Sequence, residues 1–205
     1  AVKYLEMMND LSKKKIPYSH ANDKIDIFLT KLKVLDEELD STIENLGNMY
    51  DDEKRARQQL EEIQMLLKEA KVKMRNYKLP IVHNNYYIEL EEANDSIMEV
   101  IKELDKKPIV IKTLNTRVDT ARDLVIKFYN TTNDMIKKAS LTESLIVYGN
   151  RFRYQDSMIN KGLNESQMLF YKGNYGKALD VSLDALSVVD KDIRKRVMEL
   201  YEKEN

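Results

Sequence analysis

The sequence predicts an all-α protein made of tandem antiparallel three-helix bundles that are joined by long shared helices. Three observations support this fold class. Apolar residues recur every seven residues from Ile25 to Tyr77 without a slip of register, which is typical of a helix that packs along a narrow seam. Breaks that contain proline then follow at helix-length intervals, which favours chain reversals over one long coil. The five glycines and three prolines are too few for a turn-rich β protein.

The first long helix is expected to end at about residue 78. Its middle is weak, because Thr42 and Glu53 occupy seam positions and Gly47 lies nearby, and glycine costs a helix about 1 kcal/mol relative to alanine. We expect the seam to change partner there while the helix continues. The seam residues are Ile25, Leu32, Leu39, Leu46, Glu53, Leu60, Leu67 and Met74 at position a, and Phe28, Leu35, Thr42, Met49, Ala56, Ile63, Ala70 and Tyr77 at position d.

The other elements are bounded by helix breakers. A helix over residues 1–15 should end before Pro17, and Leu79-Pro80 should end the long helix. A shorter helix is expected over 84–104, followed by a break that ends in Pro108, a residue suited to the first position of a helix. A second long helix should run from there to about residue 152, with a polar middle at 131–134.

Two shorter helices complete the chain. The first is expected over residues 157–172, with Gly173 as the residue after its C-cap. The second is expected over 174–203, with Asn174 as its N-cap and a kink at 190–192.

The helix lengths predict how the chain divides. A helix of double length with a weak centre can end one bundle and begin the next. We therefore expect an incomplete repeat of two helices at 1–48, a three-helix repeat at 49–133 and a C-terminal repeat at 134–205. This is the layout of spectrin-like repeats in an elongated rod. A lone coiled-coil dimer is the structural alternative, and a homodimer that completes the first repeat stays open.

Composition limits the classes of function. Charged residues make up 34% of the chain but the net charge is only −1, so no basic field indicates nucleic acid. No cysteine is present, which excludes disulfides and thiolate metal sites. No apolar run is long enough to span a membrane and no signal peptide is evident, so we expect a soluble piece cut from a longer protein.

The sequence offers no evident catalytic or metal site. His20 and His83 each lie beside a proline break without a ligand partner at helical spacing, and neither a phosphate-binding loop nor a nucleophile elbow occurs. Helix bundles bind metals through inward carboxylates, whereas these seam positions are almost wholly apolar. We therefore expect no enzyme activity, no cofactor and no metal. A bundle enzyme or metal carrier is the least favoured alternative.

One short segment combines residues that are enriched at protein interfaces. Glycine, two arginines and three aromatic residues fall within positions 148–154, where the heptad pattern fails. In the structural alternative, the aromatic rings close the end of a bundle and the arginines pack on carboxylates. The candidate protein-interaction patch consists of Tyr148, Gly149, Asn150, Arg151, Phe152 and Arg153.

This segment carries a family resemblance. Residues 145–153 read Leu-Ile-Val-Tyr-Gly-Asn-Arg-Phe-Arg, which is similar to the Leu-Ile-Gln-Tyr-Gly-Asn-Arg-Tyr-Arg patch near the C-terminus of EzrA proteins, the septation ring formation regulators of low-GC Gram-positive bacteria. Residues 163–186 also resemble the tail of that family. Val147 stands where the family has glutamine, whereas Asn150 and Arg151 match.

The resemblance implies a cell-division scaffold. EzrA proteins have one N-terminal membrane-spanning helix, missing here, and a cytoplasmic arc of spectrin-like repeats. They associate with the tubulin homologue FtsZ, restrain its ring assembly away from midcell, and link it to other division and wall-synthesis proteins at the septum. The patch is associated with placement at midcell. The alternative is a general helical spacer or cytoskeletal cross-linker without direct FtsZ activity.

Overall fold

The helix α2 (Tyr18–Tyr77) contains the whole predicted seam. The computed structural model describes residues 2–13 and 18–203, and α1 (Val2–Ser12) precedes α2. Pro17, the predicted break between them, lies outside the described residues. Gly47 falls within α2, so the helix continues through its weak middle as predicted. Nothing lies within 4 Å of the position that a Cβ would take at Gly47.

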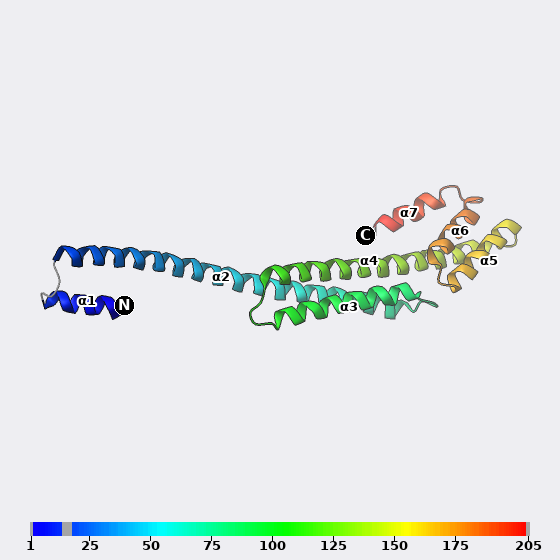
Figure 1. Ribbon diagram of the computed structural model, residues 1–205. Helices are drawn as coiled ribbons and strands as arrows, with labels where there is room; N and C mark the ends of the chain where they lie inside the picture. Colours follow the sequence, from blue (N-terminus) through cyan, green and yellow to red (C-terminus); the bar gives the residue numbers. More distant parts are fainter. Residues whose placement is uncertain (1, 14–17, 204–205) are drawn as a thin grey trace. The chain divides into compact units, whose positions relative to one another are not determined.

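The rest of the described chain is also helical (Figure 1). No strand occurs in the described residues, and the all-α prediction is confirmed. The elements are α3 (Asn84–Leu104), α4 (Ile111–Gly149), a short 3₁₀ turn η1 (Asn150–Phe152), α5 (Ser157–Tyr171), α6 (Tyr175–Ser187) and α7 (Ile193–Lys203).

Two helix boundaries differ from the prediction. Pro108 was expected to open the second long helix, but α4 begins at Ile111 because Val110, its N-cap, has an extended backbone (φ −93°, ψ 98°). The expected kink at 190–192 is a complete break between α6 and α7. There Asp190 accepts a hydrogen bond from the Asp192 N–H (3.3 Å), so its side chain stabilises a turn in place of a continuing helix.

Residues 1–55 and 56–205 form two separate units. The first contains α1 and the N-terminal part of α2, where Leu32, Leu39 and Leu46 on the seam are 42%, 53% and 60% exposed. The second contains the remainder of α2 and all later helices. The predicted repeat boundaries near residues 48 and 133 stay a prediction.

A three-helix bundle occupies the first part of the second unit, where α3 and α4 lie along the C-terminal part of α2 (Figure 1). The predicted seam residues of α2 face its core, because every second-unit seam position from Ala56 to Ala70 is buried. Burial of apolar area, at roughly 25 cal/mol per Å², stabilises such a core. Its largest contributors from the other two helices are Tyr86, Ile97, Leu104, Leu114, Val118, Val125 and Phe128.

A second core lies where α5, α6 and α7 pack on the C-terminal part of α4. Along α5 the buried residues are Ile159, Leu163, Ser166 and Phe170, which recur at helical spacing on one face. Gly173 has a positive φ of 79° and donates to the Phe170 carbonyl (2.9 Å), which confirms it as the residue after the C-cap of α5. Asn174 is the N-cap of α6, as predicted. The buried residues of this core are Leu145, Ile159, Leu163, Leu179, Leu183, Leu186, Ile193 and Val197.

The two cores meet around the middle of α4. The polar centre predicted there is well packed, because Thr132 is fully buried and its hydroxyl donates to the Phe128 carbonyl (2.8 Å). Just beyond it, Ala139 packs with Phe170 and Tyr175 from the second group of helices. The loop after α2 contributes to the same cluster through Leu79. We call this cluster the joint.

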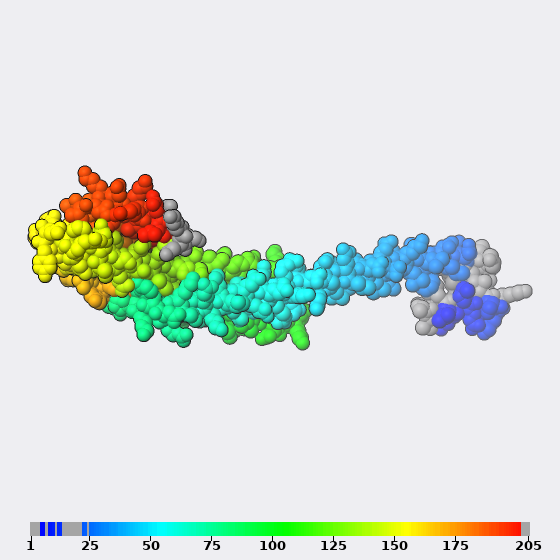
Figure 2. Space-filling model, turned by 180° about the vertical axis from the view of Figure 1, so that it is seen from behind, coloured from blue at the N-terminus to red at the C-terminus, as the bar shows by residue number. Residues whose placement is uncertain are grey.

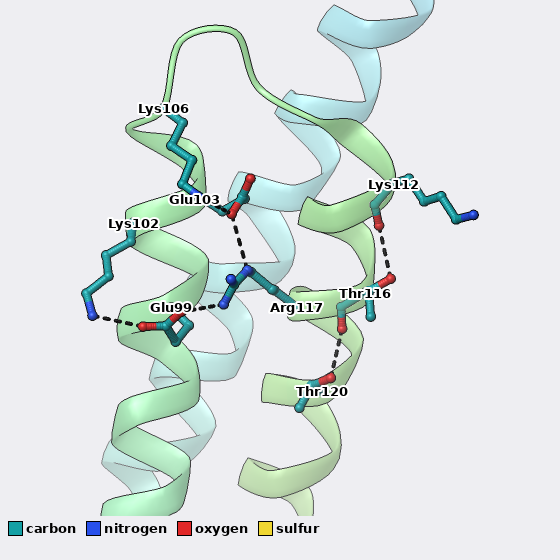
Figure 3. A network of polar contacts seen from close by, with 8 residues as sticks. All are labelled: Glu99, Lys102, Glu103, Lys106, Lys112, Thr116, Arg117 and Thr120. Carbon is teal, nitrogen blue, oxygen red and sulfur yellow. Dashed lines mark hydrogen bonds and ion pairs between the residues drawn. The ribbon is translucent and has the colours of Figure 1, made fainter.

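A polar network links α3 to α4 near the loop that connects them (Figure 3). Glu103 is only 2% exposed and pairs with Lys106 (2.7 Å) and with Arg117 Nε (3.2 Å). Arg117 also bonds Glu99, whose pKa is lowered by its hydrogen bonds to Lys102 and Arg117. A buried carboxylate that is paired in this way was not predicted, because heptad position alone gives no sign of it.

Candidate protein-interaction site

The candidate patch begins with Tyr148 and Gly149, the last two residues of α4. Gly149 is buried, and a Cβ there would lie 2.6 Å from Leu163 Cδ1 and 2.9 Å from Leu186 Cδ2. Leucine side chains from α5 and α6 therefore approach this glycine closely. Gly149 therefore allows the patch to pack closely against the second core and is itself buried.

Two aromatic residues anchor the patch to that core. The rings of Tyr148 and Phe152 meet edge to face, with centroids 5.6 Å apart, and both side chains are half-buried. The Tyr148 hydroxyl donates to Asp190 (3.2 Å) in the turn before α7, and Asp190 also pairs with Arg196. The aromatic pair thus closes the bundle end, as the structural alternative predicted for these two residues.

Arg151 lies on the outer side of the aromatic pair. Its guanidinium carbon is 4.0 Å from the Tyr148 ring centroid and 5.3 Å from that of Phe152, which is cation–π geometry. Its Nε donates to the Tyr148 carbonyl (3.1 Å). The side chain is exposed, and its terminal nitrogens have no recorded partner among the described residues. Arg151 is therefore held in place with donors still available to a ligand.

Arg153 fixes the turn from the other side. Its Nε donates to Asn150 Oδ1 (2.8 Å), and its Nη1 donates to Asn164 (2.5 Å) and Asn160 (3.3 Å) on α5. The arginines were expected to pack on carboxylates in the structural alternative, but rings and side-chain amides take that place. Asp156 then caps α5 by accepting from the Met158 N–H (2.7 Å). Arg153 is consequently a clamp between the turn and α5.

The patch residues therefore differ in what they present. Gly149 is buried, Tyr148, Phe152 and Arg153 are committed to internal contacts, and Asn150 and Arg151 are exposed. Figure 2 shows the segment around residue 150, in yellow, at the surface of one end of the second unit. An exposed amide beside a stacked guanidinium can recognise a carboxylate or a backbone carbonyl.

Sequence reasoning missed the residues that support the patch. Asn160 and Asn164 are four residues apart and so face the same side of α5, which is a signal that spacing could have given. Asp190 gave no local signal, because it lies 42 residues from Tyr148 in the sequence. Val147, the position where the related patch has glutamine, is 71% exposed and offers an apolar surface beside Tyr148.

Other kinds of site find little support in the described part of the chain. His83 is an exposed residue at the N-cap of α3, and the side chain of His20 lies outside the described atoms. No three His, Cys, Asp or Glu side chains gather there as a metal ion would require. No helix among the described residues combines the length and apolar character that crossing a membrane demands.

The fold and the patch place this chain in a class of protein, the helical bundles whose candidate contact surface is an exposed polar turn. Comparison with protein families identifies the family within that class. The chain belongs to the family of the septation ring formation regulator EzrA, whose family model matches residues 2–201. No solved structure gives a significant match.

Curated relatives carry the same description. A septation ring formation regulator EzrA from Geobacillus sp. (strain WCH70) is 32% identical over 149 residues, which are 73% of this chain and 26% of that protein. One from Staphylococcus epidermidis is 27% identical over 201 residues, 98% of this chain and 36% of the relative. One from Streptococcus sanguinis is 26% identical over 97% of this chain and 35% of the relative. The chain therefore spans about a quarter to a third of these relatives.

Proposed function

We propose that this chain is part of a non-enzymatic cell-division scaffold that regulates FtsZ ring assembly and links division and wall-synthesis proteins at the septum. Family membership over residues 2–201 supports a role in septation, because the curated relatives are named as regulators of septation ring formation. We further propose that the longer protein is anchored in the membrane by a segment outside these 205 residues and acts on the cytoplasmic face.

The observation that carries this proposal is the Asn150–Arg151 surface. The two side chains are exposed on a turn that is held by a cation–π stack and by the Arg153 clamp. A group that is held rigidly before binding loses little conformational entropy when a partner binds, which favours a specific contact over nonspecific binding. We assign this turn as the contact point for FtsZ or for another division protein.

Co-sedimentation with FtsZ polymers tests the proposal. The double variant Asn150→Ala/Arg151→Ala should reduce the amount of chain that pellets with the polymers. Helicity should stay unchanged and the melting temperature should fall only slightly, because the variant also removes the Arg151 stack and the Asn150 acceptor of the Arg153 clamp. A matched control is Arg75→Ala/Asn76→Ala, because this exposed Arg and Asn pair lies at the end of α2, away from the patch. Equal pelleting of the wild type and both variants would remove the patch from FtsZ binding.

A general helical spacer is the second candidate function. It is favoured by the extent of seam packing, since most buried residues of the second unit are core leucines, valines and alanines without any other evident role. No co-sedimentation by the wild-type chain at any concentration, with folding intact, would support the spacer and reject direct FtsZ contact by this part of the protein.

A further inference from the structure

A groove runs along one face of α4, between the C-terminal ends of α2 and α7. Tyr77 of α2 reaches α4 through its hydrogen bond to Glu143 (2.8 Å). On the other side, α7 runs back along α4 until the Tyr201 hydroxyl donates to Asp134 (Figure 1). We call this feature the α4 groove. The residues of α4 that recur every three or four positions along it, and so share one face, are Asn130, Asn133, Lys137, Ser140 and Ser144.

The dimensions of the α4 groove fit an extended chain better than a helix. The groove has a volume of about 1150 Å³ and follows residues 129–144 of α4, a length of roughly 22 Å at 1.5 Å per residue. Its mean cross-section is therefore about 50 Å². A helix of about 10–12 Å diameter needs roughly 80–110 Å². An extended strand needs about 48 Å², because strands lie ~4.8 Å apart within a sheet and sheets pack ~10 Å apart.

One positive charge in the α4 groove has no carboxylate partner. The charged side chains that line it are Lys73, Asp134 and Lys137. Lys73 pairs with Glu69 (2.9 Å), and Asp134 pairs with Lys138 (2.6 Å). No carboxylate among the described residues pairs with Lys137. The groove is therefore complementary to a ligand that brings one negative charge to Lys137.

Lys137 is held in place with donors to spare. Its side chain is half-buried, and its Nζ lies 4.3 Å from the Tyr201 ring centroid, which is cation–π geometry. Nζ also donates to the Tyr201 carbonyl. An ammonium has three donors, so this one hydrogen bond leaves donors for a ligand. A carboxylate that reaches Lys137 would form a charge-assisted hydrogen bond, which is stronger than a neutral one.

Asparagine amides supply the other polar groups that a peptide main chain requires. The side chain of Asn130 has no recorded partner among the described residues, and that of Asn133 uses only its oxygen, which accepts from Lys73 Nζ (3.2 Å). An amide side chain offers both donors and an acceptor. An extended main chain presents both N–H and C=O groups along its edge, and these need partners when they are buried. The two asparagines can therefore bind a main chain whatever its side chains are.

We propose that the α4 groove binds an extended segment of about six or seven residues from a partner protein, with an aspartate or glutamate of that segment on Lys137. The main chain of the segment lies along Asn130 and Asn133. The groove shares no lining residue with the candidate patch, so this binding is separate from the FtsZ contact proposed above.

Selection of peptides by the 205-residue chain tests the charge preference. The probe is a phage library that displays random seven-residue peptides. Peptides selected by the wild type should share Asp or Glu at one position, and Lys137→Glu should select Lys or Arg there instead. Lys112→Glu is the matched control, because it makes the same charge change at an exposed site near the start of α4 and should select the wild-type motif. No enrichment by the wild type, or one motif for the wild type and Lys137→Glu, would overturn the proposal.

Affinity for a selected peptide tests the ion pair itself. Fluorescence anisotropy should show a loss of about 10–100-fold for Lys137→Ala, the loss expected for a hydrogen bond between charged groups. Replacing the acidic residue of the peptide by its amide should weaken binding to the wild type by a similar factor. The same replacement should then have little effect on binding to Lys137→Ala, because the two groups act as a pair. Fully additive losses would show that Lys137 does not contact the acidic residue.

Blocking the groove locates the peptide. Ser144→Trp should abolish binding, because the indole would fill the space along this face of α4. Thr120→Trp is the matched control. Both hydroxyls are exposed and donate to the carbonyl four residues earlier (2.9 Å in each case), but Thr120 lies outside the groove. Circular dichroism should show that both variants stay helical. Binding of the peptide by Ser144→Trp at wild-type affinity would overturn the proposal.

Methylation of the peptide nitrogens, one at a time, tests the extended conformation. Successive N–H groups of an extended chain point to opposite edges, so the loss of affinity should alternate along the peptide. Insensitivity at every position, or a pattern without alternation, would reject the extended main chain.

Discussion

The hydroxyl of Tyr175 makes two hydrogen bonds to one residue, Ile81. It donates to the Ile81 carbonyl (2.6 Å) and accepts from the Ile81 N–H (3.3 Å). Tyr175 opens α6, and Ile81 lies in the loop between α2 and α3, 94 residues earlier. The ring of Tyr175 packs edge to face on Phe170, with centroids 5.2 Å apart. One side chain thus ties the two helix groups together at the joint.

Tyr175→Phe should lower the free energy of unfolding of the second unit. The ring stays in place, but both Ile81 backbone groups lose their partner, at a cost of about 1–2 kcal/mol. Urea denaturation followed by circular dichroism measures the change. Tyr171→Phe is the matched control, because Tyr171 is 60% exposed and should cost almost nothing. Equal midpoints for the two variants would show that the hydroxyl contact contributes no stability.

The joint, against which Tyr77 packs, should also be sensitive to alkali. Burial, helped by a hydrogen bond to Glu143 (2.8 Å), raises the pKa of Tyr77 from 10.0 to about 12. A folded-state pKa above the unfolded value means that this contribution to stability is complete below pH 10 and is lost as pH rises towards 12. The wild type should therefore lose more stability than Tyr77→Phe between pH 10 and 12. Parallel stability curves for the two proteins would contradict this linkage.

Gly149→Ala should destabilise the second unit by about 1–3 kcal/mol, since the added methyl group would overlap Leu163 and Leu186. Gly47→Ala should have the opposite sign. Nothing lies within 4 Å of a Cβ at Gly47, and alanine favours a helix by up to about 1 kcal/mol over glycine. Thermal unfolding of both variants gives the comparison. A Gly149→Ala variant as stable as the wild type would mean that the packing described at the end of α4 is wrong.

Arg117→Ala should cost about 1–3 kcal/mol, because the buried Glu103 carboxylate would keep Lys106 as its only cation partner among the described residues. The control is Arg122→Ala on the same helix, whose pair with Asp119 lies at the surface (2.9 Å) and should be worth little. Chemical denaturation of each variant measures the difference. If Arg122→Ala lowers the free energy of unfolding as much as Arg117→Ala does, the buried network contributes no more to stability than a surface ion pair.

The sequence predicts the helices of this protein well because heptad spacing reports directly which side of a helix faces a core. Residues such as Ala56, Ile63 and Leu67 are buried at the positions that spacing assigned. The same spacing could not show that the seam at Leu39 stays exposed, because the pattern reports an apolar face and not the presence of a partner. Pro108 was misplaced because the extended Val110 delays the start of α4.

The candidate patch was only partly predictable. Its composition indicated a surface of unusual chemistry, and Asn150 and Arg151 are exposed. Which patch residues are exposed and which make internal contacts depends on neighbours from other helices and turns. Examples are the contacts of Arg153 with Asn164 and of Tyr148 with Asp190. Local spacing carries no information about the contact of Tyr148 with Asp190, because these two residues come together only when α6 packs against α4.

The continuity of α4 has a mechanical consequence. This helix contributes Leu114 and Val125 to the first core and Leu145 to the second, with no loop between them. Separating the two groups of helices would require breaking backbone hydrogen bonds within α4 as well as opening the joint. Tension applied across the second unit is therefore carried by an unbroken column of hydrogen bonds, and a twist imposed on one group is passed to the other.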